Sequence, residues 1–63
     1  MSLGENLKRM RIERGLTQEA LAKSVGVSGP MISQVERGTQ TLTLPLANEL
    51  ANVLGCRIDD FLK

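Results

Sequence analysis

Apolar residues recur along this chain at the three- and four-residue spacing of amphipathic helices, and a glycine follows the end of each of the first four runs. The first run ends at Gly15 and predicts a helix over about residues 3–14. Its stripe consists of Leu3, Leu7, Met10 and Arg14, and Ile12 falls off it.

Two shorter helices joined by a tight turn are predicted next, because polar caps and glycines alternate at close spacing. Thr17 is a good N-cap for a helix over about residues 18–24, and Gly26 stands where the backbone would need a positive φ. Ser28 can then cap a helix over about residues 29–36, which the next glycine ends. The apolar contacts of this pair come from Leu21, Ala22, Val25, Val27, Ile32 and Val35.

The rest of the chain predicts a fourth helix and a short final turn. Thr43 can cap a helix that tolerates Pro45 in its first turn and stops at Gly55. No strand pattern, linker or repeat interrupts the chain, so the expected fold class is all-α, a compact five-helix bundle in one domain over residues 1–63. The fourth helix should bury Leu46, Ala47, Leu50, Val53 and Leu54, and a final turn with Ile58, Phe61 and Leu62 should fold back as a lid.

Composition fits one small soluble domain. The chain has 63 residues, of which 41% are hydrophobic and 24% charged. No apolar run approaches the length of a bilayer span, and the N-terminus lacks a basic segment followed by an apolar stretch. We therefore expect a cytoplasmic protein with no membrane partner.

Few residues could carry catalysis or bind a metal. The chain has no histidine, and its single cysteine, Cys56, stands where a helix should end and is expected to be a small buried residue rather than a nucleophile. Asp59 and Asp60 would point about 100° apart on a helix, so they favour a helix start rather than paired acid–base work. The sequence therefore indicates no enzyme, no metal site, no cofactor and no evident small-molecule ligand.

The net charge is only +1, so composition by itself does not indicate a nucleic-acid partner. The distribution of charge is slightly more informative. Residues 1–37 contain six basic and four acidic side chains, whereas residues 38–63 contain two basic and three acidic ones. The positive half contains the predicted two-helix unit, as a DNA-binding surface would require.

Several short motifs follow one another in an order that resembles the phage repressor and Cro-type (XRE-like) helix-turn-helix family over almost the whole chain. They are Gly15-Leu16-Thr17-Gln18, Leu21-Ala22, Val25-Gly26-Val27-Ser28, Ser33-Gln34-Val35-Glu36-Arg37-Gly38 and Leu50-Ala51-Asn52-Val53-Leu54-Gly55. The resemblance implies a lambda-repressor-like fold and double-stranded DNA as the partner. It also places the third helix in the major groove and the second across the phosphate backbone.

Residues at the start of the second helix and on the third helix are the expected DNA contacts. A helix N-terminus offers unpaired N–H groups and partial positive charge, so Thr17 and Gln18 can hold a phosphate, although Thr17 is also a plain cap. Gln34 is the best direct base reader, because its amide could pair bidentately with adenine; the alternative is a solvated surface glutamine. Ser28 caps the helix and its hydroxyl could also meet phosphate, whereas Ser33 could contact either a base or the DNA backbone.

Gly29 and Pro30 depart from the family pattern, which commonly places long polar residues at these positions. The pair offers no side-chain donor. It permits close approach of the backbone and an apolar contact, for example with a thymine methyl group, so more of the recognition would depend on DNA shape. Met31 is expected to be partly buried.

Arg11 and Glu36 match positions where the family often pairs a first-helix arginine with a third-helix glutamate. We expect a structural ion pair between them, and Arg11 is also a candidate phosphate contact. Arg37, at the end of the third helix, is a candidate contact to the DNA backbone and equally a favourable C-terminal charge.

The loop over residues 39–43 is a second departure, because it lacks the basic residues with which relatives often grip the DNA backbone. This predicts weaker and less salt-sensitive binding per subunit. Leu42 is instead an exposed apolar candidate, although an isolated surface leucine is ordinary. A symmetric homodimer contact could be made by Leu42, Leu44, Arg57 and Ile58.

The expected function is sequence-specific regulation of transcription, by a repressor that binds a short palindromic operator through its third helix. Two alternatives stay open. The same fold could be a protein-interaction module such as an antitoxin, which the low net charge and the Gly29-Pro30 pair favour. It could also be the DNA-reading head of a longer regulator.

Overall fold

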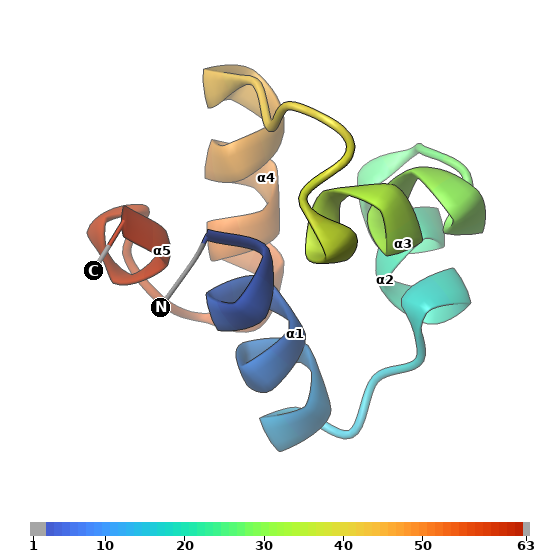
Figure 1. The fold of residues 1–63 in the computed structure, drawn as a ribbon. Helices are drawn as coiled ribbons and strands as arrows, with labels where there is room; N and C mark the ends of the chain where they lie inside the picture. Colours follow the sequence, from blue (N-terminus) through green and yellow to red (C-terminus); the bar gives the residue numbers. More distant parts are fainter. Residues whose placement is uncertain (1–2, 63) are drawn as a thin grey trace.

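Five helices form where the caps and glycines of the sequence place their ends (Figure 1). The computed structural model describes residues 3–62, and the side chain of Leu62 lies outside what it describes. The three ranges predicted for the first three helices differ from the observed ones by one residue at the C-terminal end. The helices are α1 (Leu3–Glu13), α2 (Gln18–Val25), α3 (Gly29–Arg37), α4 (Leu44–Leu54) and α5 (Asp59–Leu62).

Side-chain caps and a left-handed glycine fix the turn between α2 and α3. Thr17 Oγ1 accepts a hydrogen bond from the N–H of Ala20 at 3.0 Å, and Ser28 Oγ accepts one from the N–H of Met31 at 3.3 Å. Gly26 has φ 74°, a left-handed conformation in which its N–H bonds back to the last turn of α2. Both predicted caps and the predicted stop are therefore confirmed.

Thr43 is the exception among the predicted caps. It occupies the N-cap position of α4 with extended backbone, but its side chain makes no capping hydrogen bond. Pro45 lies in the first turn of α4 as Pro30 does in α3, where Ser28 still caps the N–H of Met31, so the proline does not account for the missing cap. The expectation that Thr43 caps through its side chain was wrong.

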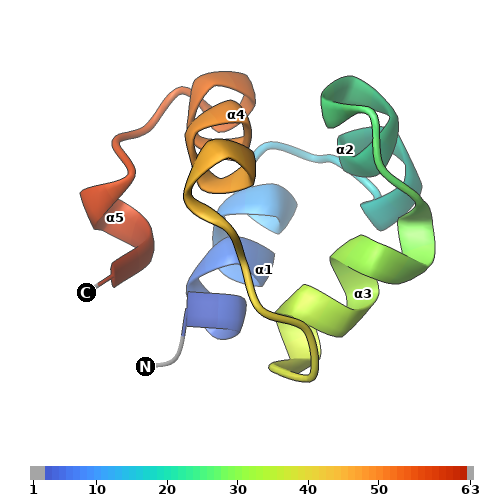
Figure 2. The same cartoon turned by 90° about the horizontal axis from the view of Figure 1, so that it is seen from above.

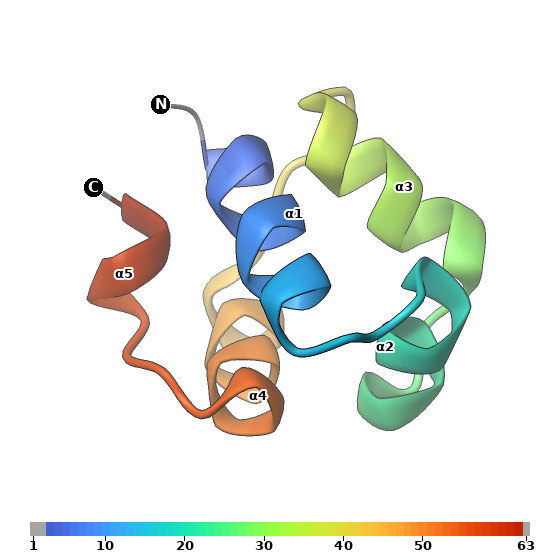
Figure 3. The same cartoon turned by 90° about the horizontal axis from the view of Figure 1, so that it is seen from below.

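The core lies where α1 meets α3 on one side and α5 on the other, while α2 packs against both α3 and α4 (Figures 1 and 3). Phe61 of α5 is buried, and Asn6 Nδ2 donates a hydrogen bond to its carbonyl at 3.0 Å, so the final turn does close over the core. The contribution expected of the Leu62 side chain lies outside the described residues. The fully buried apolar side chains are Leu7, Leu21, Ile32, Val35, Leu50, Leu54 and Phe61.

The buried face of α4 differs from the predicted one at two positions. Val53 is 38% exposed, whereas Ala51 is buried. The helix turns one stripe to the core, and Ala51 lies one turn after Ala47 on that stripe, whereas Val53 lies beside it. Within residues 3–62, no helix is long and apolar enough to cross a membrane.

Candidate nucleic-acid interface

The N-terminal turn of α2 and the outer face of α3 border one shallow hollow of about 570 Å³. Five of the predicted DNA contacts meet there, although they come from two helices. Figure 2 shows the two helices side by side, joined by their short turn. The lining residues are Gln18, Glu19, Gly29, Pro30, Ser33 and Arg37.

Beneath this surface, Arg11 and Glu36 form the predicted ion pair. Arg11 Nε donates to Glu36 Oε2 at 2.7 Å, and Nη2 donates to Oε1 at 3.2 Å. The side chains are 11% and 2% exposed, so the pair is buried. The remaining terminal nitrogen of Arg11 donates to the carbonyl of Leu16 at 2.7 Å. The pair joins α1 to α3 and to the segment that leads into α2.

Gln18 joins the same network, which the sequence did not predict. Its Nε2 donates to Glu36 Oε1 at 3.0 Å. This hydrogen bond fixes the orientation of the amide and leaves the second N–H of Nε2 available for a phosphate oxygen. A phosphate contact by Gln18 is therefore compatible with this hydrogen bond, and it stays a prediction. A phosphate contact by Arg11 would compete with its bonds to Glu36 and Leu16, and it stays a prediction.

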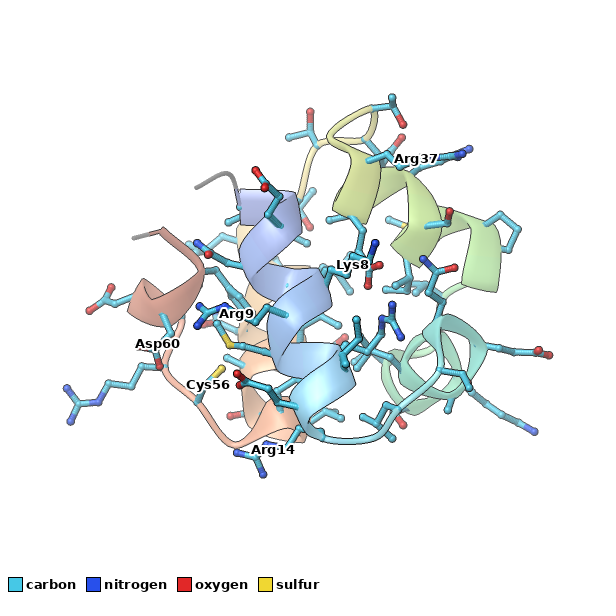
Figure 4. All side chains as sticks on the ribbon, turned by 60° about the horizontal axis from the view of Figure 1, so that its bottom comes forward. Lys8, Arg9, Arg14, Arg37, Cys56 and Asp60 are labelled. Atoms are coloured by element: carbon cyan, nitrogen blue, oxygen red, sulfur yellow. The ribbon has the colours of Figure 1, made fainter. Side chains whose placement is uncertain are left out.

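Residues on the outer face of α3 remain open to solvent. Gln34 is exposed and follows Ser33, which is half-buried in the hollow. Arg37 lies in the last turn of α3 and points outward, away from α1 and α5 (Figure 4). Met31 is half-buried, as predicted. The hydrophilic side of α3 is therefore accessible, on the same side of the molecule as the start of α2.

Sequence reasoning missed Glu19, the only acidic residue that lines the hollow. Glu19 is exposed, and its Cα lies 3.8 Å from the position that a Cβ on Gly29 would occupy. In the sequence it is one more acidic residue in the first turn of a helix, where such residues are common. Its position beside Gly29 depends on how α2 packs against α3, which no local pattern signals.

The predicted dimer residues surround a second, smaller hollow, apart from Arg57. Leu44 is 67% exposed, but Leu42, expected to be exposed, is half-buried and packs against the core. Leu42 lies beside Leu3 of α1 and Phe61 of α5 in the wall of this hollow, so the core draws it inward. This hollow has a volume of about 180 Å³ and is lined by Leu3, Leu42, Leu44, Ala47, Ile58 and Phe61.

Cys56 lies near the connection between α4 and α5, on the side of the molecule away from α3 (Figure 4). Burial raises the pKa of its thiol; the carboxylate of Asp60 raises it further, and Arg14 opposes both effects. The thiol is half-buried and stays protonated at neutral pH, which disfavours a role as a nucleophile.

Comparisons with known proteins match most of the chain. A family model described as HTH_3, helix-turn-helix, matches residues 7–61. An uncharacterized HTH-type transcriptional regulator of Archaeoglobus fulgidus is 41% identical over 54 residues, which are 86% of this chain and 77% of that protein. The HTH-type transcriptional regulator PrpR of Mycobacterium tuberculosis is 44% identical over 43 residues, which are 68% of this chain and 9% of PrpR. The crystal structure of the P22 c2 repressor in complex with synthetic operator 9T has a TM-score of 0.93 at 35% identity and covers 100% of this chain and 96% of that chain.

Proposed function

The chain belongs to the helix-turn-helix family described as HTH_3, and from this premise we propose that it is a sequence-specific DNA-binding regulator of transcription, which represses by occupying a short palindromic operator. The relatives of this chain are named transcriptional regulators, and the P22 c2 repressor of similar structure is bound to an operator. An enzymatic role has no support from the family or from these relatives. A protein that occupies promoter DNA works in the compartment that holds the DNA. This supports a cytoplasmic location.

One observation carries this proposal. The hydrophilic side of α3 is open to solvent and shares its hollow with Gln18, the first residue of α2. A duplex that receives α3 in its major groove would therefore meet the N-terminus of α2 with its phosphate backbone, which is the docking geometry of helix-turn-helix proteins.

Each predicted contact then takes a role that its chemistry allows. Gln34 reads a base edge, and Gln18 with Thr17 holds a phosphate. Arg37 contacts the backbone at the other end of α3. Ser28 and Ser33 supply hydroxyl groups that bind either base or phosphate.

Gly29 and Pro30 give the start of α3 a different role from that of long polar readers. Their lack of side-chain donors supports an apolar contact of Pro30 with a thymine methyl group and recognition by DNA shape around it. Replacement of thymine by deoxyuridine at each operator position in turn should weaken binding at the contacted position by about 1 kcal/mol, roughly the hydrophobic contribution of one methyl group. A uniform response at all positions would contradict the contact.

Two copies would bind the two half-sites of the operator. Exposed Leu44, with Leu42, Ile58 and Arg57 around it, supports a symmetric contact between subunits. Such a contact would raise affinity without new bonds to DNA, because the second subunit binds from a high effective concentration.

Two other functions remain as candidates. A net charge of only +1 favours a protein-interaction module such as an antitoxin. The match to 9% of PrpR favours the DNA-reading head of a longer regulator, because there the same unit is a small part of the protein.

Titration of a fluorescent random duplex at two salt concentrations tests the proposal. A DNA reader binds random duplex at about 50 mM salt and loses much of that affinity at about 200 mM, because phosphate contacts release counterions. Selection of bound duplexes from a random pool should then yield a palindromic sequence. Absence of binding to either pool would contradict the proposal and favour the interaction module.

A further inference from the structure

Glu19 is the unexpected member of the hollow between α2 and α3. It is exposed, and within residues 3–62 its carboxylate has neither a hydrogen bond nor an ion pair. Gly29, beside it, has no side chain, and Pro30 has no polar group. Neither Gly29 nor Pro30 therefore offers a side-chain group that could pair with the carboxylate.

No basic residue forms an ion pair with this carboxylate within residues 3–62. Arg37 is the only basic residue of the hollow and lies eight residues along α3 from Gly29. Lys23 lies one turn after Glu19 on α2 and is exposed. A phosphate that approaches the start of α3 therefore meets an exposed carboxylate that no ion pair neutralises.

We propose that Glu19 is an affinity-limiting residue of the DNA interface, whose carboxylate repels the phosphates of any duplex that docks on α2 and α3. This inference rests on the proposed DNA-binding function. Because the repulsion does not depend on base sequence, it weakens binding by one subunit everywhere. Stable occupancy then requires two subunits on a matched operator, where their contacts add.

Glu19 also has a role in the free protein, which does not conflict with this one. An acidic residue in the first turn of α2 interacts favourably with the helix dipole. A different role on DNA would be to accept a hydrogen bond from the amino group of cytosine, and that role predicts a loss of base preference rather than a general gain of affinity.

The test compares Glu19→Gln with Glu13→Gln in titrations against the selected operator and a random duplex. Both substitutions raise the net charge by one, but Glu13 ends α1 and lines a different hollow, formed by α1 alone. Glu19→Gln should bind both duplexes more tightly, by about threefold per subunit for a phosphate charge about 7 Å away in water. The gain should shrink as salt is raised, whereas Glu13→Gln should change affinity much less.

The possible results of these titrations distinguish failure of the inference about Glu19 from failure of the proposed DNA-binding function. Equal affinity of Glu19→Gln and the parent protein, or an equal gain in Glu13→Gln, overturns the inference and leaves the proposed function intact. A loss of preference for cytosine at one position, without a general gain, assigns Glu19 to base reading and also overturns it. If neither protein binds any duplex, the proposed function fails and the inference fails with it. Thermal melts of both variants show whether folding is intact, and a less stable variant would not bind more tightly.

Discussion

Glu36 accepts hydrogen bonds from side chains of two other helices while its own side chain is almost fully buried. Arg11 of α1 supplies two of these bonds, and Gln18 of α2 supplies the third. One carboxylate therefore fixes the orientation of the residue that should hold a phosphate and neutralises the buried guanidinium. Glu36 therefore contributes both to the stability of the fold and to the geometry of the interface.

Removal of this carboxylate should be costly. Glu36→Ala leaves the guanidinium of Arg11 buried without its partner, and we expect a loss of about 3–5 kcal/mol in the free energy of unfolding, measured by urea denaturation. The double variant Arg11→Met with Glu36→Leu serves as the control, because it removes both charges and should recover most of the loss. A loss below about 1 kcal/mol in the single variant would show that the pair contributes no more than a surface ion pair.

Gln34 and Gln18 should differ in what their loss does to DNA binding. Gln34→Ala should weaken binding to the selected operator by about 1–3 kcal/mol and relax base preference at one position. Gln18→Ala should weaken binding to all duplexes alike, because a phosphate carries no sequence information. Binding measurements on the operator and its single-base variants separate the two. A sequence-selective loss in Gln18→Ala, or unchanged affinity and preference in Gln34→Ala, would contradict these assignments.

Single residues were predictable where the family motif pairs them and unpredictable where packing alone brings them together. The partnership of Arg11 and Glu36 followed from the resemblance and is confirmed. The bond from Gln18 to the same carboxylate depends on where α2 ends up relative to α3, as does the position of Glu19 beside Gly29. Neither contact has a local signal in the sequence, because the partners are separated by a turn whose geometry is set by packing.

α1 approaches the backbone of α3 closely at Gly4, and the lack of a side chain there makes this possible. A Cβ on Gly4 would lie 2.5 Å from the carbonyl oxygens of both Val35 and Glu36. Backbone atoms cannot move aside as a flexible side chain can. The C-terminal turn of α3, which carries Glu36 and Arg37, is therefore positioned by the absence of a side chain on α1.

Gly4→Ala should lower the free energy of unfolding by about 1–3 kcal/mol, the usual cost of overpacking, although alanine favours a helix more than glycine does. Gly29→Ala is the matched control, because a Cβ there would meet no atom closer than 3.8 Å. It should leave stability unchanged or raise it by about 0.4–1 kcal/mol through a less flexible unfolded chain. Chemical denaturation of both variants checks the contrast, and equal effects would contradict the role assigned to Gly4.

Helix boundaries were the most predictable elements, because each depends on a few neighbouring residues. Thr17, Ser28 and Gly26 fixed the ends of α2 and α3 as expected. The errors came where tertiary packing or a second local effect decided the outcome. Thr43 makes no side-chain cap, Val53 lies beside the buried stripe of α4, and Leu42 packs against the core and is half-buried.

The molecule as a whole leaves only three large apolar side chains exposed among its described residues: Ile12, Leu44 and Val53. Ile12 lies among the charged residues of α1, whereas Leu44 borders the apolar hollow over Phe61. A core built from 63 residues is small, so a contact between two copies would add buried apolar area that one copy lacks. Leu44 is the exposed residue whose surroundings favour such a contact.

Leu44→Ser should therefore weaken binding to a palindromic operator while leaving affinity for an isolated half-site unchanged. The substitution removes apolar area from the proposed contact without changing charge or touching α3, and burial of a leucine contributes about 1.5–3 kcal/mol. Ile12→Ser removes a similar side chain, 57% exposed, from the outer face of α1 and should leave both affinities as they are. Titration of the two duplexes, with sedimentation of the free proteins, measures the difference. If Leu44→Ser and Ile12→Ser behave alike on the palindrome, two subunits meet through another surface or bind independently, because a real contact at Leu44 couples the half-sites only while its apolar surface is intact.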